Sequence, residues 1–104
     1  MGSYRHQVFR QLRYGHLPAF LALQREKNEL YAAGGLTPYR MWAPAFGGLH
    51  HMVLEAEFDS MADFEKQHLA AKAIGRVGEI NAAQLEHVIE GSASDALARI
   101  ALEA

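Results

Sequence analysis

A chain of 104 residues is long enough to bury one hydrophobic core but too short for two, so we expect a single domain over residues 1–104. Half of the residues are hydrophobic and 21% are charged, as in globular proteins, and the net charge of −2 without a basic block argues against a nucleic-acid surface. The absence of cysteine excludes disulfides, thiolate nucleophiles and cysteine-ligated metals.

The first part of the chain predicts a strand followed by a helix. Residues 4–12 mix apolar side chains with polar ones on one parity, which suits a sheet that is wetted on one face or lines a polar cavity. A helix is expected over residues 17–33, because apolar residues recur near the helical period and Gly34-Gly35 stops the pattern. Glu26 and Lys27 lie in the middle of this helix and are expected to be solvated.

The centre of the chain predicts a β-hairpin. We expect a second strand from residue 39 to about 43, a connection over 44–48 that contains Pro44, and a third strand over 50–58. The third strand alternates clearly. One face carries Met52, Leu54, Ala56 and Phe58 and should pack on helices, while the other carries His51, Val53, Glu55 and Glu57.

The last part of the chain predicts a second helix capped by Ser60, with Asp63 three residues later. This helix should weaken at Gly75 and Gly78 and continue as a helical piece to residues 81–83. Residues 84–90 fit either a helix or a strand. We assign a strand, because a fourth strand completes a β-α-β-β-α-β order. A short terminal helix is then expected over residues 95–102, capped by Ser92 or Ser94.

This order of elements resembles the dimeric α/β-barrel superfamily of ferredoxin-like domains, an α+β fold with a four-stranded antiparallel sheet and helices on one face. Residues 47–64 read Gly-Gly-Leu-His-His-Met-Val-Leu-Glu-Ala-Glu-Phe-Asp-Ser-Met-Ala-Asp-Phe and are similar to the NIPSNAP type. That type shows a glycine after the second strand, a hydrophobic third strand and an Asp-Ser-Leu-Ala-like opening to the second helix. Residues 13–21, Arg-Tyr-Gly-His-Leu-Pro-Ala-Phe-Leu, resemble the entry to its first helix.

The resemblance implies a homodimer in which two sheets meet face to face, with a cavity between sheet and helices for a small organic molecule. A four-stranded sheet with helices on one side does leave its other face uncovered. Phe9 and Val53 would cover that face, together with whichever of Met41 and Trp42 faces away from the helices. The superfamily includes monooxygenases, isomerases, polyketide cyclases and haem enzymes, so the fold does not fix the chemistry.

The best acid–base candidates are the ionisable residues on one face of the third strand. A carboxylate facing a partly apolar cavity can have a raised pKa, and a nearby histidine can share its proton. If the protein is an enzyme, we expect His51 and Glu55 to handle the proton, Arg13 and Glu57 to contact the ligand, and Trp42 to form a wall. The alternative is a wetted sheet face or a dimer rim with salt bridges between subunits.

No metal or cofactor is expected. His50 and His51 are adjacent on a strand and point to opposite faces, and the sequence contains no His-x-x-x-His pair and no nucleotide-binding loop. Chemistry without a cofactor is therefore favoured, with a non-catalytic interaction or regulatory dimer as the alternative function. The chain starts without the apolar core of a signal peptide and has no run as long as a membrane span, so we expect a cytoplasmic protein.

Overall fold

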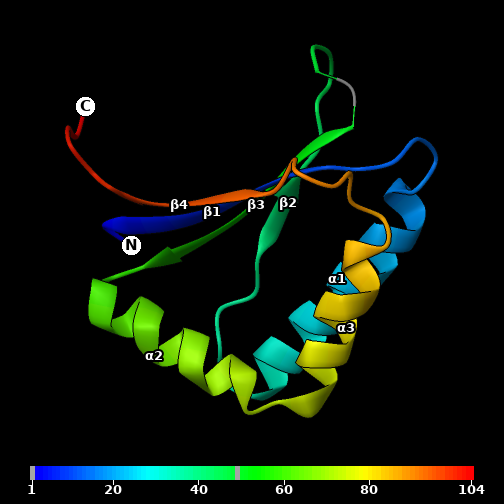
Figure 1. The fold of residues 1–104 in the computed structure, drawn as a ribbon. Coiled ribbons are helices and arrows are strands. Elements are labelled where there is room, and N and C mark those ends of the chain that lie inside the picture. The colour runs from blue at the N-terminus through cyan, green and yellow to red at the C-terminus, as the bar shows by residue number, and fades with distance from the viewer. Residues whose placement is uncertain (1, 49) are drawn as a thin grey trace.

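The computed structural model describes residues 2–48 and 50–104, which form one four-stranded sheet with three helices on one of its faces (Figure 1). All strand pairs are antiparallel, and the strand order is β2-β3-β1-β4. This is the α+β ferredoxin-like fold that the sequence predicts. In chain order the elements are β1 (Tyr4–Gln11), α1 (Leu17–Ala33), β2 (Arg40–Trp42), β3 (His51–Phe58), α2 (Met61–Lys72), α3 (Gly75–Leu85) and β4 (Ser94–Arg99).

The core lies between the sheet and the helices, and the alternation of β3 builds it. Met52, Leu54, Ala56 and Phe58 all face the helices and are at most 5% exposed, as predicted. Met52 and Leu54 form one buried cluster with Leu12, which directly follows β1, with Phe20 of α1 and with Val88. Burial of these side chains fixes the register, because a shift by one residue would expose the whole set.

The predicted helix boundaries are confirmed where the sequence carries a cap or a stop. α1 spans Leu17–Ala33, with Pro18 in its first turn, and the chain leaves it through Gly35 at φ 74°. At the start of α2 the Ser60 hydroxyl accepts a hydrogen bond from the Asp63 backbone N–H at 3.0 Å. This bond satisfies one of the free N–H groups at the helix terminus.

The predicted strand over residues 84–90 is wrong. α3 continues to Leu85, because Val77, Ile80 and Gln84 form one buried stripe at helical spacing. A turn follows in which only Val88 forms a bridge, to Leu12 at the end of β1. The helical segment also divides earlier than predicted, at Ile74, whose extended backbone (ψ 101°) separates α2 from α3.

The predicted terminal helix is also wrong, because residues 94–99 form the fourth strand. The segment Ser-Asp-Ala-Leu-Ala-Arg has helix-forming residues, yet it pairs with the free edge of β1 from Ser94 opposite Phe9 to Arg99 opposite Tyr4. Pairing satisfies the backbone groups of that edge, and this tertiary gain exceeds the weak local preference. Gly91, at φ 82°, and the Ser92 hydroxyl, which donates to the Ile89 carbonyl at 2.6 Å, shape the turn before β4.

Candidate functional site: a polar-lined cavity between sheet and helices

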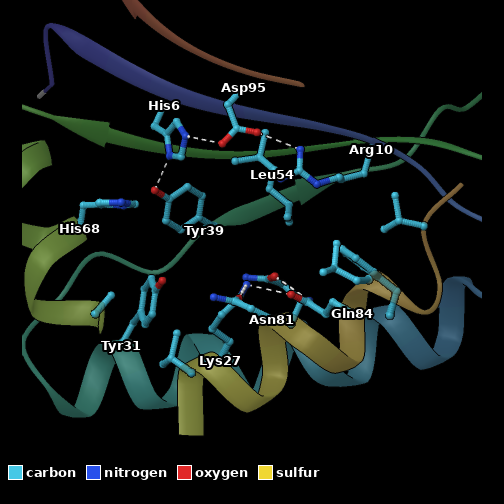
Figure 2. Close-up of a pocket in the computed structure, with 18 of the residues that line it drawn as sticks. His6, Arg10, Lys27, Tyr31, Tyr39, Leu54, His68, Asn81, Gln84 and Asp95 are labelled. Atoms are coloured by element: carbon cyan, nitrogen blue, oxygen red, sulfur yellow. Dashed lines mark hydrogen bonds and ion pairs between the residues drawn. The ribbon is translucent and has the colours of Figure 1, made fainter. Parts of the chain in front are cut away.

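A cavity of about 470 Å³ lies between the sheet and the helices (Figure 2). Its apolar wall includes Val8, Phe20, Leu54 and Val77. Polar side chains converge on it from two sides: His6, Tyr39 and Asp95 from the sheet side, and Lys27, Asn81 and Gln84 from the helices. Both the volume and this mixture of an apolar wall with a few polar groups are typical of small-molecule sites, which span roughly 300–1,000 Å³.

On the sheet side, Asp95, His6 and Tyr39 form a hydrogen-bonded chain. Asp95 Oδ2 lies 3.3 Å from His6 Nε2, and His6 Nδ1 lies 2.6 Å from the Tyr39 hydroxyl. Because a carboxylate only accepts, His6 Nε2 carries the proton, Nδ1 is the acceptor, and the Tyr39 O–H donates to it. The other oxygen of Asp95 accepts from Arg10 Nη1 at 2.8 Å, which holds the carboxylate in place.

Burial sets the protonation state of this chain. Desolvation lowers the pKa of His6 below its ordinary value, although the hydrogen bond to Asp95 opposes the shift. Desolvation also strongly raises the pKa of Tyr39. At neutral pH the imidazole is therefore neutral and the phenol protonated. A ligand proton can pass to the Tyr39 oxygen while the Tyr39 proton moves to His6, whose imidazolium Asp95 then stabilises.

Side-chain amides from two helices hold the backbone at and just before Tyr39. Asn28 of α1 donates through Nδ2 to the Tyr39 carbonyl at 2.8 Å and accepts from the Tyr39 N–H at 3.0 Å. Gln67 of α2 makes the same paired contact with Thr37, at 2.7 and 2.8 Å. These two amides fix the connection between α1 and β2, so Tyr39 is presented by an ordered segment.

On the helix side, Lys27 points into the cavity, contrary to the prediction that it is solvated. Its ammonium donates to Asn81 Oδ1 and Gln84 Oε1 of α3, both at 2.8 Å. Burial lowers the pKa of Lys27 to about 8. Its neighbour Glu26 does lie at the surface, where it forms a bidentate ion pair with Arg76 at 2.6 and 2.8 Å.

A directed series of amides connects the two sides of the cavity. Gln84, which accepts from Lys27, donates to Gln24 Oε1 at 3.1 Å, and Gln24 donates to Asn28 Oδ1 at 3.0 Å. Asn28 in turn binds the backbone of Tyr39. Each amide has its oxygen toward the preceding donor, so the amide orientations are fixed and the Gln84 oxygen is held toward Lys27.

The predicted site residues lie elsewhere. His51, Glu55 and Glu57 of β3 and Trp42 of β2 occupy the face of the sheet opposite the helices, which we call the open face, and none of them lines the cavity. Arg13 lies in the exposed turn after β1 and does not line it either. The structure also does not bring His51 and Glu55 together, because four residues along a strand span about 13 Å.

Glu55 belongs instead to an ion-pair network on the open face. Its side chain is only 9% exposed, and it lies 3.5 Å from Arg5 Nε and 3.6 Å from Arg40 Nη2. Glu57 contacts the same two arginines, at 2.9 and 3.6 Å. Trp42 lies beside this network, opposite Val53. Met41 packs against the core, so Trp42 is the one of the two that points away from the helices.

Sequence reasoning missed His6, Lys27, Tyr39 and Asp95. Two of them had a readable signal. His6 shares the parity of Val8 on β1, and Lys27 falls on the stripe that also contains Phe20, Gln24 and Tyr31. Asp95 had none, because it was assigned to a helix.

Within residues 2–48 and 50–104, no three His, Asp or Glu side chains are grouped closely enough to hold a metal ion. In the same described part of the chain, none of the helices combines the length and the apolar character needed to cross a membrane.

Comparison with solved structures supports the fold. No family model matches the chain, and no curated protein matches it significantly. A NIPSNAP domain protein from Burkholderia xenovorans is similar over 94% of both chains, with 13% identity and a TM-score of 0.76. A NIPSNAP family protein from Agrobacterium tumefaciens is similar over 94% of this chain and 87% of its own, with 16% identity and a TM-score of 0.73.

A structure described as an antibiotic biosynthesis monooxygenase is also similar, over 95% of this chain and 99% of its own, with 14% identity and a TM-score of 0.72. At these identities the likeness shows a shared fold. The resemblance to NIPSNAP-type structures that the sequence predicts is therefore confirmed at the level of the fold.

Proposed function

We propose that the protein is a NIPSNAP-like homodimer that binds a small organic molecule in the cavity between sheet and helices. We further propose that, as an enzyme, it would transfer a proton of that molecule through Tyr39, His6 and Asp95 without a cofactor. The observation that supports this most is the hydrogen-bonded chain itself: it ends on a tyrosine hydroxyl that faces the cavity, beside an apolar wall. The cytoplasmic location stays a prediction.

The proposal of a homodimer rests on the open face. Phe9 and Val53 lie opposite one another on it, and Trp42, which is 55% exposed, lies next to Val53. An apolar strip flanked by ion pairs resembles the core and rim of a protein interface. A second copy of this chain would cover it, with the helices of both copies on the outside.

The alternative function, a non-catalytic interaction dimer, is favoured by one specific observation. Glu55, which was predicted to be catalytic, and Glu57, which was predicted to contact the ligand, are both paired with Arg5 and Arg40 on the open face. If the cavity were a packing defect without a ligand, this network and the apolar strip would be the functional surface.

Native mass spectrometry of the protein purified from its own host separates these functions. We expect a dimer that retains an organic molecule. The double variant His6→Gln/Tyr39→Phe should lose the molecule and remain a dimer, while the matched open-face variant His51→Gln/Glu55→Gln should keep it.

Three outcomes would count against the proposal. A monomer at micromolar concentration would contradict the dimer. Retention of the molecule in the cavity variant but not in the open-face variant would place the site on the open face. An empty wild-type dimer, with no small molecule bound from a host extract, would favour the interaction function.

A further inference from the structure

We propose that the ligand of this cavity is an organic acid, whose carboxylate lies against the Lys27 ammonium and whose apolar body extends toward Tyr39. This inference rests on the proposed function and names its ligand class. It is carried by the charge balance of the cavity wall and by the hydrogen bonds of Lys27.

The cavity wall is positively charged although the chain is negatively charged overall. Arg10, Lys27 and Lys72 line the cavity, whereas Asp95 is the only carboxylate among the described lining residues. Three cations against one anion leave a formal charge of +2, in a chain whose net charge is −2. A partly enclosed, apolar wall concentrates the field of such charges, so the cavity attracts anions.

Of the two lining cations that have no recorded ion pair, Lys27 is partly buried, whereas Lys72 is exposed. Arg10 is paired with Asp95 at 2.8 Å, whereas both recorded partners of the Lys27 ammonium are neutral amide oxygens. Among residues 2–48 and 50–104, no carboxylate lies within ion-pair distance of Lys27. An ammonium has three N–H donors, so one remains for a ligand oxygen.

The amides around Lys27 hold its side-chain nitrogen in place. The series from Gln84 through Gln24 to Asn28 fixes the Gln84 oxygen toward the ammonium. This arrangement keeps the cation in place before a ligand arrives, so that little reorganisation is needed on binding. A buried, unpaired ammonium is costly, and a ligand carboxylate is the group that would offset this cost.

The opposite end of the cavity selects the rest of the ligand. Besides Lys27 and Tyr39, the lining includes the apolar side chains of Val8, Phe20 and Leu54. An organic acid with an apolar or aromatic body fits this sequence of contacts: anion at the helices, apolar middle, and a polar or ionisable group at the Tyr39 hydroxyl.

A matched pair of fluorescent probes tests the anion preference directly. 1-Anilinonaphthalene-8-sulfonate and N-phenyl-1-naphthylamine share one aromatic skeleton and differ by the sulfonate. We expect wild type to bind the sulfonate at least tenfold more tightly than the neutral amine. Lys27→Met should abolish this preference while retaining the neutral probe, and Lys27→Arg should keep it.

The matched control is Lys66→Met, which removes an exposed lysine of α2 that does not line the cavity. This variant should bind both probes as wild type does. The same loss of preference in Lys66→Met would mean that general surface charge attracts the sulfonate, and would overturn the inference.

The pH dependence gives a second test. Only the charged form of Lys27 attracts an anion, and with a pKa of about 8 its charged fraction falls about tenfold between pH 7 and pH 9. The affinity for the sulfonate, which is ionised throughout this range, should therefore fall about tenfold in wild type and stay constant in Lys27→Arg.

The other titratable groups that face the cavity are identified by element. They are His6 and the permanently charged Arg10 on β1, Asp95 on β4, Tyr31 on α1, Tyr39 before β2, and His68 and Lys72 on α2, while the lining residues of α3 are not titratable. Asp95 is held by Arg10 and His6, and burial raises the pKa values of Tyr31 and Tyr39. A pH effect that persists in Lys27→Arg would assign the dependence to one of these groups and overturn the role of Lys27.

The outcomes also separate this inference from the proposed function. Equal binding of both probes by wild type and Lys27→Met would leave a small-molecule cavity but remove its preference for anions. Failure of both probes to bind to any variant would contradict the cavity as a ligand site, and the inference would fail with it.

Discussion

The two faces of the sheet organise their ionisable side chains differently. On the open face, Arg5 and Arg40 alternate with Glu55 and Glu57 across three strands, and the four charges cancel. On the face toward the helices, polar groups surround a cavity, and the partly buried cation Lys27 of α1 has only neutral amide partners among the described residues. A face that neutralises its own charges suits contact with another protein surface, whereas a face with an uncompensated charge is organised for a ligand.

The largest difference between the faces should appear in stability. Leu54→Ala removes a side chain of the core cluster that is 5% exposed and should lower the free energy of unfolding by about 3 kcal/mol. Val53→Ala changes the next residue of β3, on the open face, and should cost under about 1 kcal/mol in the monomer. Urea denaturation of both variants at low protein concentration measures this contrast, and equal losses would contradict it.

Local sequence signals predict part of this architecture, whereas the fourth strand and the site that depends on it have no such signal. The period-two alternation of residues 51–58 and the caps at Gly34 and Ser60 are local signals, so the buried face of β3, both ends of α1 and the start of α2 were predictable. The fourth strand was not, because residues 94–99 prefer a helix locally and become a strand only by pairing with β1. The error also hid the site, because Asp95 reaches His6 only through that pairing.

The residues of the candidate site were hard to predict for a related reason: they meet only in the folded sheet. His51 and Glu55 were predicted to act together because they share one face of the third strand, yet four residues along a strand span about 13 Å. The groups that do meet come from positions 6, 39 and 95, and no local spacing joins them. Only the register of β1 with β4 and the amide contacts of Asn28 bring them together.

The next largest effect concerns the dimer proposed for the open face. Phe9→Asp places a carboxylate in the apolar strip opposite Val53 and should weaken dimerisation at least about a hundredfold, or about 2.7 kcal/mol. Size-exclusion chromatography with light scattering over a dilution series measures the dissociation constant.

The control for this prediction is Leu69→Asp, which alters an exposed apolar residue of α2 on the opposite side of the molecule. This variant should dimerise as wild type does. An unchanged dissociation constant in Phe9→Asp, with the fold intact by circular dichroism, would mean that the sheets do not meet.

On the cavity side, replacing Lys27 should have a smaller effect of opposite sign, a gain in stability. The pKa of Lys27 falls from 10.5 to about 8 on folding, so the charged form is disfavoured in the folded state. The cost is complete below pH 8, declines as pH rises toward 10.5 and vanishes above it. It is about 3 kcal/mol at neutral pH by the free energy of 1.36 kcal/mol per pKa unit.

Lys27→Met should therefore stabilise the ligand-free protein at pH 7 by about 1–2 kcal/mol, the remainder being offset by the lost hydrogen bonds to Asn81 and Gln84. Thermal denaturation at pH 7 and pH 10 tests this, because the gain should shrink at the higher pH. A destabilised variant at pH 7 would show that the ammonium supports the fold rather than a ligand.

The smallest effect distinguishes a wetted open face from a covered one. Glu57→Gln removes the partly exposed carboxylate that contacts Arg5 and Arg40 but keeps a hydrogen-bond acceptor, so this surface network should lose only about 0.5–1 kcal/mol. In the monomer this loss should decrease between 50 mM and 1 M NaCl, because salt screens exposed charges. In the dimer the same ion pairs would be buried, and the loss should not depend on salt. Denaturation of wild type and variant at two protein concentrations and two salt concentrations therefore shows whether this face is covered in the dimer. A loss equally dependent on salt at both protein concentrations would mean that the network stays in water and that the dimer, if it forms, uses another surface.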